Sequence, residues 1–404
     1  MENRYDKYKD SGIAWIGEIP EHWKVIPHKR IMRKKKIIKE FYAGENILSL
    51  TKKGVIIRDL EAGGKMPTTF NGYQVLYPDN LLMCLFDIDV TPRCVGIIKD
   101  EGLSSPAYSQ FILNELGYTP FFDYLLRYMD DEKCLLHLSK NLRNSLTEDD
   151  FGQIETIVPS FPEQQAIADY LDWKCGEIDE LITLQEEMIT KLQSYKQSVI
   201  TEAVTKGLDK NVPLKDSGIK WIGKIPEHWK ITKVQYLAQL KSGYNLTTEE
   251  ITDNGLYPVY GGNGIRGYYD KYFLEGDYVL IGRQGALCGN INYSTNKSWA
   301  TEHAVVCYPK IKYVTRWFGE LLRVMNLNQY SLAAAQPGLA VERIKLLPIP
   351  IIPLSEQQAI ADYLDQRCSE IDELISIKQQ KIEKLKEYKK SLIFECVTGK
   401  RKVS

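Results

Sequence analysis

The sequence predicts an α+β protein in which two α+β domains are separated by two long antiparallel helices that form a coiled coil, with pseudo-two-fold symmetry. One observation is a repeat, because EQQAIADYLD occurs at 163–172 and again at 356–365. A second repeat precedes it, with SGIAWIGEIPEHWK at 11–24 and SGIKWIGKIPEHWK at 217–230. The segments between the repeats differ from each other. An internal repeat of this kind has to be interpreted before any local pattern, because it decides the architecture.

The repeats divide the chain into six consecutive parts. These are an N-terminal connector at 1–24, a first domain at 25–158, a first helical spacer at 159–207, a second connector at 208–230, a second domain at 231–350 and a second helical spacer at 351–404. At this length the chain can form two globular domains in addition to the helices.

Each connector combines proline, glycine and two tryptophans in a short stretch, which predicts a packed, irregular segment. We expect Trp15 and Trp221 to anchor the two connectors. Each connector also contains one histidine, His22 or His228. A histidine with no second ligand nearby in the sequence is more often a structural hydrogen-bonding residue than a metal ligand, and we expect the structural role here.

The two domains show the mixed pattern of an α+β fold. In the first, runs such as ENILSL and LLMCLFDIDV predict strands, and YTPFFDYLLRYM predicts a helix. In the second, GLYPVYGGNGIRGYY and GDYVLIGRQGALCGNINYS predict short strands around glycine turns, and VTRWFGELLRVM predicts a helix. Alternating apolar residues bounded by glycine and proline favour strands, whereas a three-and-four spacing favours helices.

Behind each EQQAIADYLD segment, apolar residues recur three and four positions apart, as in the seam of a coiled coil. The expected seam contains Ile178, Leu181, Met188, Leu192, Tyr195 and Val199 in the first helix, and Ile371, Leu374, Leu385, Tyr388 and Leu392 in the second. Ile182, Ile189, Ile375 and Ile382 widen this stripe. Neither helix can bury its stripe alone, so we expect the two helices to pack together. The second helix ends where residues 8–13 would continue the pattern, which predicts adjacent termini and antiparallel helices.

Composition restricts the class of protein further. A hydrophobic content of 44% with 26% charged residues is typical of globular proteins. The polar N-terminus predicts no signal peptide, and the apolar runs are too short for a membrane span, so we expect a cytoplasmic protein without membrane contact. Eight cysteines without a CxxC pair predict neither a zinc site nor disulfides. Cys175 and Cys368 occupy matching positions of the repeat, and we expect both to be buried.

The net charge of −1 hides an uneven distribution. Residues 163–207 contain nine acidic and four basic residues, whereas residues 224–354 contain fourteen basic and ten acidic residues. A further basic cluster, HKRIMRKKK, lies at 28–36. The first helix should therefore repel phosphate, while the domains attract it locally.

At this point the chain resembles the specificity subunit of type I restriction–modification enzymes. The resemblance rests on DSGIxWIGxIPEHWK, a variable domain and PxPxxEQQAIADYLDxxxxxIDELI, all of which occur twice in one chain and together cover nearly all of it. It implies that the variable segments are target recognition domains, each of which reads one half of a bipartite target in double-stranded DNA. The two domains are similar to different subtypes of such a domain. The helices would set the spacing and dock two methylation (M) subunits.

The resemblance also implies that catalysis belongs to other subunits. S-adenosylmethionine, ATP and Mg would be held by the M subunits and by the restriction (R) motor–nuclease subunits, so this chain would need no cofactor and no metal. The sequence agrees, because it contains neither NPPY or DPPY nor GxxxxGK[ST], HExxH or GxSxG. Two alternatives stay open: a stand-alone DNA methyltransferase or nuclease, and a repeat adaptor or carbohydrate-binding scaffold, which the 25 tyrosines would suit.

Candidate DNA-binding residues are basic and amide side chains in glycine-containing loops. Arginine matches the edge of guanine and asparagine or glutamine that of adenine, while lysine mainly neutralises phosphate. In the first domain they are Lys52, Lys53, Arg58, Lys65, Arg93, Lys140, Asn141, Arg143 and Asn144. In the second domain they are Asn263, Arg266, Tyr268, Arg283, Gln284 and Lys297.

Candidate partner-binding residues come from the two copies of the helical repeat. Because the repeat occurs twice, we expect two equivalent partners. In the first helix they are Glu163, Gln164, Gln165, Asp169, Glu177, Asp179 and Glu180. In the second helix they are Glu356, Gln357, Gln358, Asp362, Glu370, Asp372 and Glu373.

Overall fold

Two long helices carry the repeated sequence: α3 (Phe161–Lys206) and α7 (Leu354–Val397). The Glu163 carboxylate accepts hydrogen bonds from the backbone N–H (3.1 Å) and hydroxyl (2.6 Å) of Ser160, which caps the start of α3. Each helix is followed by a glycine with positive φ, Gly207 (77°) after α3 and Gly399 (72°) after α7. Such a left-handed residue is a common helix terminator, and glycine adopts it without a steric penalty.

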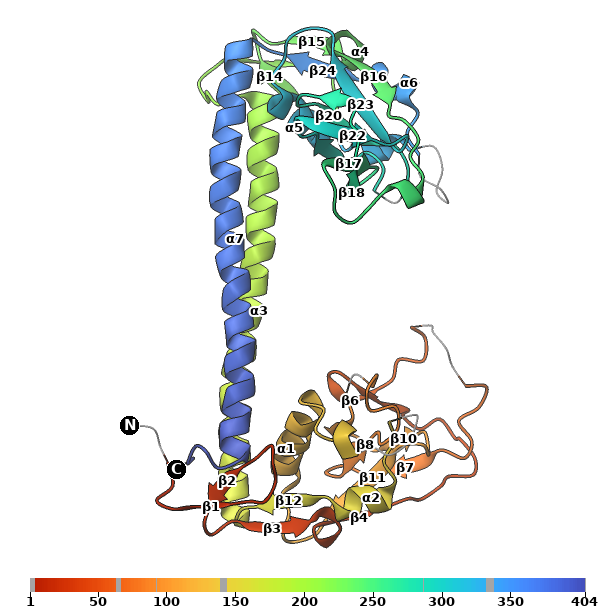
Figure 1. Cartoon of the computed structure of the whole chain (residues 1–404), viewed down its shortest axis with the longest axis vertical. Helices are drawn as coiled ribbons and strands as arrows, with labels where there is room; N and C mark the ends of the chain where they lie inside the picture. The colour runs from red at the N-terminus through yellow and green to blue at the C-terminus, as the bar shows by residue number, and fades with distance from the viewer. Residues whose placement is uncertain are drawn as a thin grey trace. The chain divides into compact units, whose positions relative to one another are not determined.

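The computed structural model (Figure 1) describes residues 4–62, 67–91, 93–138, 144–285, 287–331 and 338–403. The chain divides into unit 1, Met1–Gln185 with Gln380–Ser404, and unit 2, Glu186–Gln379. Each unit therefore contains one connector, one α+β domain and a segment of each long helix. In each unit the α3 and α7 segments lie side by side and run antiparallel. The fold class predicted from the sequence is confirmed.

The seam between the helices differs from the predicted one at every second position. The inward positions of α3 are Ile178, Ile182, Gln185, Ile189, Leu192, Lys196 and Val199, and those of α7 are Ile371, Ile375, Lys378, Ile382, Leu385, Lys389 and Leu392. The prediction is wrong for Leu181, Met188, Tyr195, Leu374 and Tyr388, which are 42–50% exposed. The isoleucines lie inward instead: Ile382 is buried, and Ile182, Ile189 and Ile375 are partly buried. The structure also brings the ammonium groups of Lys196 and Lys389 within 2.6–2.7 Å of Asp372 and Asp179 on the neighbouring helix.

Each connector forms a short hairpin with the same register: β1 (Tyr8–Asp10) with β2 (Glu18–Pro20), and β13 (Leu214–Asp216) with β14 (Lys224–Pro226). Trp23 and Trp229 are fully buried, whereas Trp15 and Trp221 are only partly buried. The prediction that Trp15 and Trp221 are the anchors is therefore wrong. Trp23 and Trp229 can be buried because a glutamate at the start of a long helix accepts a hydrogen bond from each indole N–H.

The connectors also contact the ends of the long helices. A Cβ atom on Gly399, after α7, would overlap Pro20, and one on Gly207, after α3, would lie 3.2 Å from the Trp229 ring. The Tyr8 hydroxyl donates a hydrogen bond to the Gly399 carbonyl (3.2 Å). The beginning and the end of the chain thus lie against each other in unit 1, as the sequence predicts.

The unit 1 domain is built on an antiparallel sheet in the order β4-β11-β8-β9. Its strands are β4 (Met32–Lys34), β8 (Leu81–Met83), β9 (Val95–Ile97) and β11 (Ser109–Leu113). Three strand pairs accompany it: β3 (Lys24–Pro27) with β12 (Glu155–Val158), β5 (Leu48–Thr51) with β6 (Gly54–Ile57), and β7 (Gln74–Leu76) with β10 (Gly102–Ser104). Helix α1 (Thr119–Asp131) packs between the sheet and the long helices, and α2 (Glu148–Gln153) precedes β12 (Figure 1).

The unit 2 domain contains a sheet in the corresponding order, β16-β23-β20-β21. Its strands are β16 (Ala238–Ser242), β20 (Val279–Gly282), β21 (Ile291–Tyr293) and β23 (Ala304–Pro309). A second sheet, β18-β17-β22-β19, contains β17 (Tyr257–Gly261), β18 (Gly264–Tyr269), β19 (Leu274–Glu275) and β22 (Lys297–Ala300). The remaining strands and α-helices of this domain are β15 (Lys230–Lys233), α4 (Val234–Leu237), α5 (Thr315–Val324), α6 (Val341–Lys345) and β24 (Pro348–Ile351), with β15 paired to β24.

The two domains therefore share a core and differ in what surrounds it. Helices α1 and α5 occupy the same place in the element order, and so do α2 and α6. The additional strands form two antiparallel pairs in unit 1, but a four-stranded sheet with a parallel β17–β22 pair in unit 2. That the two domains represent different subtypes stays a prediction.

Two predictions from composition can be compared with the structure. Cys175 and Cys368 are 5% and 4% exposed, which confirms their burial. Among the described residues, no helix has the length and apolar character needed to cross a membrane.

Candidate nucleic-acid and partner interfaces

The first glutamate of each EQQAIADYLD segment binds the connector of its own unit. The His22 Nε2 atom lies 2.8 Å from Glu163 Oε1, and His228 Nε2 lies 2.8 Å from Glu356 Oε1. Burial raises the pKa of Glu163, but the hydrogen bonds from Ser160 and His22 outweigh it, so the pKa is lowered and the carboxylate is favoured. Both histidines thus have the structural role that the sequence predicts. Within the described parts of the chain, no group of three or more His, Cys, Asp or Glu side chains could hold a metal ion.

The first glutamine of each segment is buried and bonded to the backbone of its own domain. Gln164 is 0% exposed; its Oε1 accepts from the Tyr118 N–H (2.7 Å), and its Nε2 donates to the carbonyls of Leu116 (2.9 Å) and Pro159 (3.0 Å). Gln357 is 3% exposed and bonds in the same way to Val314 N–H (2.9 Å) and to the neighbouring Ile352 carbonyl (2.9 Å). Gln164 and Gln357 join helix to domain. Because both are buried, neither lies on the partner surface, and the prediction of a partner role is wrong for these two residues.

Two further predicted partner residues bridge the long helices. Asp179 accepts from Lys389, and Asp372 accepts from Lys196, at 2.6–2.7 Å. The other predicted partner residues lie at or near the surface of the helices: Gln165, Asp169, Glu177, Glu180, Gln358, Asp362, Glu370 and Glu373. For these the partner role stays a prediction.

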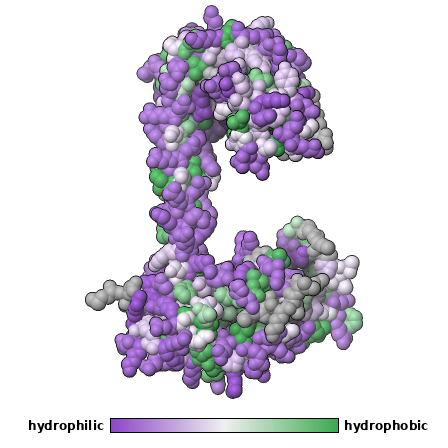
Figure 2. All heavy atoms as spheres, in the orientation of Figure 1, coloured by the Kyte–Doolittle hydropathy of each residue, from purple (hydrophilic) through white to green (hydrophobic). Residues whose placement is uncertain are grey.

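The shifted seam leaves one unpaired stripe on each long helix. The stripe on α3, which we call the first helix face, consists of Trp173, Glu177, Glu180, Leu181 and Leu184. The second helix face contains the matching residues of α7, Gln366, Glu370, Glu373, Leu374 and Ile377. The exposed fractions are 42% and 50% for the two leucines of the first face, and 47% and 53% for Leu374 and Ile377. Apolar side chains interrupt the otherwise hydrophilic surface of the helices in Figure 2.

In unit 2, four predicted DNA-binding residues lie around loops that pack closely together. A Cβ atom on Gly282 would overlap the Gly262 carbonyl, and one on Gly262 would lie 3.1 Å from the Gln284 carbonyl. Glycine is therefore required where the β17–β18 turn meets the end of β20. This contact brings Asn263 of the turn close to Arg283 and Gln284, which follow β20, while Arg266 lies on β18 next to the turn.

The same loops contain polar residues that the sequence analysis missed. The Asn290 Nδ2 donates to Asn263 Oδ1 at 2.7 Å. The backbone N–H of Arg283 donates to the backbone carbonyl of His303 at 2.8 Å. A Cβ atom on Gly264 would lie 3.3 Å from the Asn292 amide oxygen. The signal in the sequence was the glycine next to Asn290, which marks a turn as clearly as the glycine beside Gln284. Together these amides form a polar cluster that suits base edges in a DNA groove, while the Arg283 guanidinium donates to the Ser242 hydroxyl at 3.1 Å.

The other two unit 2 candidates lie outside this cluster. Tyr268 pairs through its backbone with Thr252, and its hydrogen bonds are 2.8 and 3.0 Å long. Lys297 lies on β22, and its ammonium group is 4.8 Å from the centre of the Tyr272 ring. Their DNA-binding role stays a prediction.

In unit 1 the described candidates lie around the β5–β6 turn and the sheet edge. Lys52 and Lys53 are exposed at the turn, and Arg58 directly follows β6. Lys53 and Arg93 line two neighbouring cavities of about 430 and 760 Å³, which share Tyr124, Arg127 and Asp172. The sequence analysis missed Arg127, whose neighbour four positions earlier in α1, Asp123, is its ion-pair partner.

The remaining unit 1 candidates differ in how far they can be placed. The Asn144 backbone has a φ of 44°, and its carbonyl accepts from the Ile88 N–H at 3.2 Å. Lys65, Lys140, Asn141 and Arg143 lie outside the described residues. Three lysines of the basic cluster at 28–36 contact residues of their own domain. Lys29 donates a hydrogen bond to Gln153, Lys34 forms an ion pair with Glu148, and the Lys35 ammonium group lies 3.5 Å from the centre of the Tyr77 ring.

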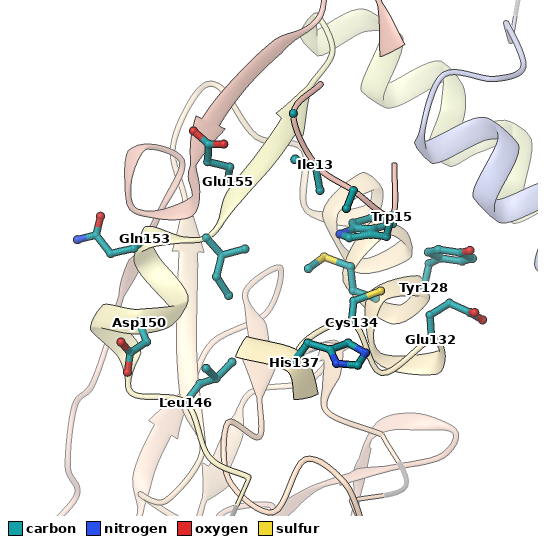
Figure 3. A pocket seen from close by; sticks show the side chains of 14 residues that line it. Ile13, Trp15, Tyr128, Glu132, Cys134, His137, Leu146, Asp150, Gln153 and Glu155 are labelled. Atoms are coloured by element: carbon teal, nitrogen blue, oxygen red, sulfur yellow. The ribbon is translucent and has the colours of Figure 1, made fainter. Parts of the chain in front are cut away.

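A further cavity of about 980 Å³ lies in unit 1 between the connector, α1 and α2 (Figure 3). Its apolar wall includes Trp15 and Tyr128, whose rings are 5.8 Å apart. Glu132, Asp150 and Glu155 also line the cavity, and its described lining contains neither lysine nor arginine. Because carboxylates repel phosphate, this cavity does not suit nucleic acid.

Comparison with known proteins shows what the chain is similar to. Residues 226–387 match the family described as the Type I restriction modification DNA specificity domain. The Type I restriction enzyme EcoprrI specificity subunit of Escherichia coli is 38% identical over 150 residues, which are 35% of this chain and 37% of that protein. The MjaVIII specificity subunit of Methanocaldococcus jannaschii is 25% identical over 282 residues, which are 63% of each protein. The chain thus spans 37% and 63% of the lengths of these two relatives.

Solved structures are similar over most of the chain. A chain from the structure "Structural basis underlying complex assembly and conformational transition of the type I R-M system" has a TM-score of 0.73 at 13% identity, and the match covers 94% of this chain and 98% of that one. The HsdS subunit from Thermoanaerobacter tengcongensis has a TM-score of 0.55 at 14% identity, with the same coverage. At these identities the likeness shows the fold alone, but it agrees with the sequence matches. Residues 226–387 thus match the type I restriction modification DNA specificity domain, and the chain is similar in sequence and in fold to type I specificity subunits.

Proposed function

We propose that this chain is the non-catalytic, sequence-specific DNA-binding subunit of a type I restriction–modification complex. Each α+β domain reads one half of a bipartite target in double-stranded DNA. Methylation and cleavage belong to M and R subunits, which hold S-adenosylmethionine, ATP and Mg. The observation that carries this proposal is the contrast between a repeated scaffold and unrepeated loops.

The scaffold contacts recur in the two units with nearly the same geometry. The histidine–glutamate distance is 2.8 Å in both connectors, and both buried glutamines accept the backbone N–H just before α1 or α5. In unit 2 the polar cluster joins Asn263, in the β17–β18 turn of a sheet that unit 1 lacks, to Asn290, in the β20–β21 connection of the shared sheet. Two different reading surfaces on one repeated support are what a target with two different halves requires.

The helix faces support docking of two M subunits. Both faces combine glutamates with two exposed aliphatic side chains at helical spacing, and the repeat places one face on each helix. Exposed apolar stripes of this kind are typical of helix–helix interfaces. The duplication of the face favours two copies of one partner over two unrelated partners.

The length of the helices supports a role in spacing. Helix α3 contains 46 residues and α7 contains 44, so each is about 65–70 Å long at about 1.5 Å per residue. Each runs without interruption from one unit into the other. We propose that this continuous pair sets the length of the unspecified gap between the two half-sites.

A domain exchange tests the proposal. Residues 231–350 are replaced by the corresponding domain of another specificity subunit, and the methylated sequences are mapped in cells that contain the M subunits. We expect one half-site to change while the other half-site and the gap stay the same. A change in both half-sites would contradict independent reading by the two domains.

The two alternatives are tested with the isolated chain. Methylation or cleavage of DNA by the purified chain would support a stand-alone enzyme. DNA binding that falls steeply with salt is expected here, because counterions are released when basic residues neutralise phosphates. Salt-independent binding to oligosaccharides, with no affinity for DNA, would instead support the carbohydrate-binding scaffold.

A further inference from the structure

The two helix faces differ at one position, and we propose that this difference makes the two docking sites unequal. The first helix face binds one copy of the M subunit more tightly, so a complex with a single M subunit carries it on α3 of unit 1. Trp173 is the residue responsible. The inference rests on the proposed docking of M subunits to the helix faces.

The faces form a natural matched pair. Glu177, Glu180 and Leu181 recur as Glu370, Glu373 and Leu374, and Leu184 is replaced by the similar Ile377. Even a local ion pair recurs, since Lys174 contacts Glu177 at 2.8 Å and Arg367 contacts Glu370 at 2.6 Å. The exception is the position of Trp173, which is Gln366 in the second face.

Trp173 is exposed but held in place. Trp173 is 57% exposed, whereas tryptophan is highly buried on average in folded proteins. The Lys174 ammonium group lies 3.9 Å from the centre of the ring, and the Tyr170 ring packs edge-on at 6.1 Å. The ring therefore loses little freedom when a partner covers it. Positions 173, 177, 180 and 184 lie on one side of an α-helix, so one partner surface can cover Trp173 and Leu184 together.

Gln366 offers the partner much less. Its amide nitrogen already donates to Glu370 at 3.1 Å, so a partner gains a hydrogen bond only by replacing this one. It also has far less apolar surface than an indole ring. Tryptophan is among the residues most often found at energetic centres of protein interfaces, where its loss costs at least tenfold in affinity. We therefore expect the first face to bind at least about tenfold more tightly than the second.

The test uses the full chain, the M subunit of the same system and native mass spectrometry over a range of M concentrations. The wild type should show two stepwise dissociation constants that differ by about tenfold beyond the statistical factor for two sites. The exchange Trp173→Gln should weaken only the tighter step, and Gln366→Trp should strengthen only the weaker one. Each change alone should make the two faces nearly equal. Tyr236→Gln, which alters another exposed aromatic residue in α4, is the matched control and should change neither constant.

Two further variants separate the possible failures. Leu181→Glu and Leu374→Glu place a charge in the first and second face, respectively. If each removes one M subunit but Trp173→Gln leaves the two constants as far apart as before, the inequality proposed here is wrong and docking on the faces stands. If neither removes an M subunit, the docking proposal itself is wrong. Circular dichroism of each variant verifies that the helices are intact.

Discussion

The two units contain the same framework but differ in their buried polar residues. In both, a histidine and a tryptophan of the connector bind the first glutamate of a long helix, and the next glutamine binds the domain. Yet His28, buried in unit 1, corresponds to Val234 in unit 2, and both are 0% exposed. The repeated contacts are those that any pair of domains needs to sit on this support. The unrepeated ones show where each domain has changed on its own.

The strongest test of this comparison concerns the buried glutamines. Gln164 makes three hydrogen bonds to backbone groups, at 2.7, 2.9 and 3.0 Å, whereas Gln357 makes two, both at 2.9 Å. Leucine in place of Gln164 leaves those backbone groups buried without partners, at about 1–3 kcal/mol each. We expect Gln164→Leu to lower the free energy of unfolding by about 4 kcal/mol and Gln357→Leu by about 3 kcal/mol. Urea denaturation measures both.

Two neighbouring glutamines provide the control. Gln165 and Gln358 are exposed, so Gln165→Leu and Gln358→Leu should change the free energy of unfolding by less than about 0.5 kcal/mol. If the buried and exposed variants were equally stable, the glutamines would not join helix and domain. A larger loss for Gln357 than for Gln164 would contradict the ranking by number of hydrogen bonds.

A second prediction uses the pH dependence of His28. Burial lowers the pKa of His28 from 6.5 to about 4, and its ring stacks on Phe151 with the centroids 4.5 Å apart. Its Nδ1 donates to the Phe151 carbonyl at 3.2 Å, which raises the pKa, but burial has the larger effect and favours the neutral imidazole in the folded protein. In the unfolded chain His28 binds a proton below about pH 6.5, whereas in the folded chain His28 binds it only near pH 4. The stability that His28 supports is therefore complete above pH 6.5 and lost as the pH falls toward 4.

Unit 2 supplies the substitution for this test. His28→Val introduces the residue that occupies the matching position there, and it removes the titrating group. Between pH 7 and pH 4.5 the wild type should lose about 2.5 kcal/mol more than the variant, as measured by urea unfolding at both pH values. Val234→Ile, a change at the matching site, should leave the pH dependence as it is. An identical loss in wild type and His28→Val would show that other groups cause it.

The sequence predicts the architecture well because the repeats are long and the connectors and helices occur in the same order twice. It predicts the seam less well. Two alternative stripes on α3 share Ile178, Gln185, Leu192 and Val199, and they differ by one residue at each position between these four. Helical spacing cannot choose between Leu181 and Ile182. The choice depends on the other helix, where Asp372 is available to the ammonium group of Lys196.

The candidate sites show the same limit. Glutamine is usually a surface residue, so the sequence alone predicts Gln164 on a partner surface. Its burial depends on the backbone near Tyr118, 46 residues earlier in the chain. Asn290 was missed because its neighbour Asn263 lies 27 residues away, and only the packing of two glycine turns brings them together. Contacts between distant segments are what a local pattern leaves out.

The smallest expected effect concerns the ion pairs between the long helices. Asp179–Lys389 and Asp372–Lys196 are matching pairs at 2.7 and 2.6 Å, and the aspartates are 60% and 57% exposed. Exposed ion pairs contribute about 0.2–1 kcal/mol, so Asp179→Asn and Asp372→Asn should each lower the free energy of unfolding by no more than that, and equally. High salt should reduce both effects.

The same two variants also test whether these aspartates belong to the partner surface. Each aspartate is already paired with a lysine, so Asp179→Asn and Asp372→Asn should change the affinity for the M subunit by no more than about twofold. This is of the size expected for a surface change, about 0.5 kcal/mol. Glu177→Gln, on the first helix face, is the matched comparison, and a larger effect of Asp179→Asn on assembly than of Glu177→Gln would return Asp179 to the docking surface.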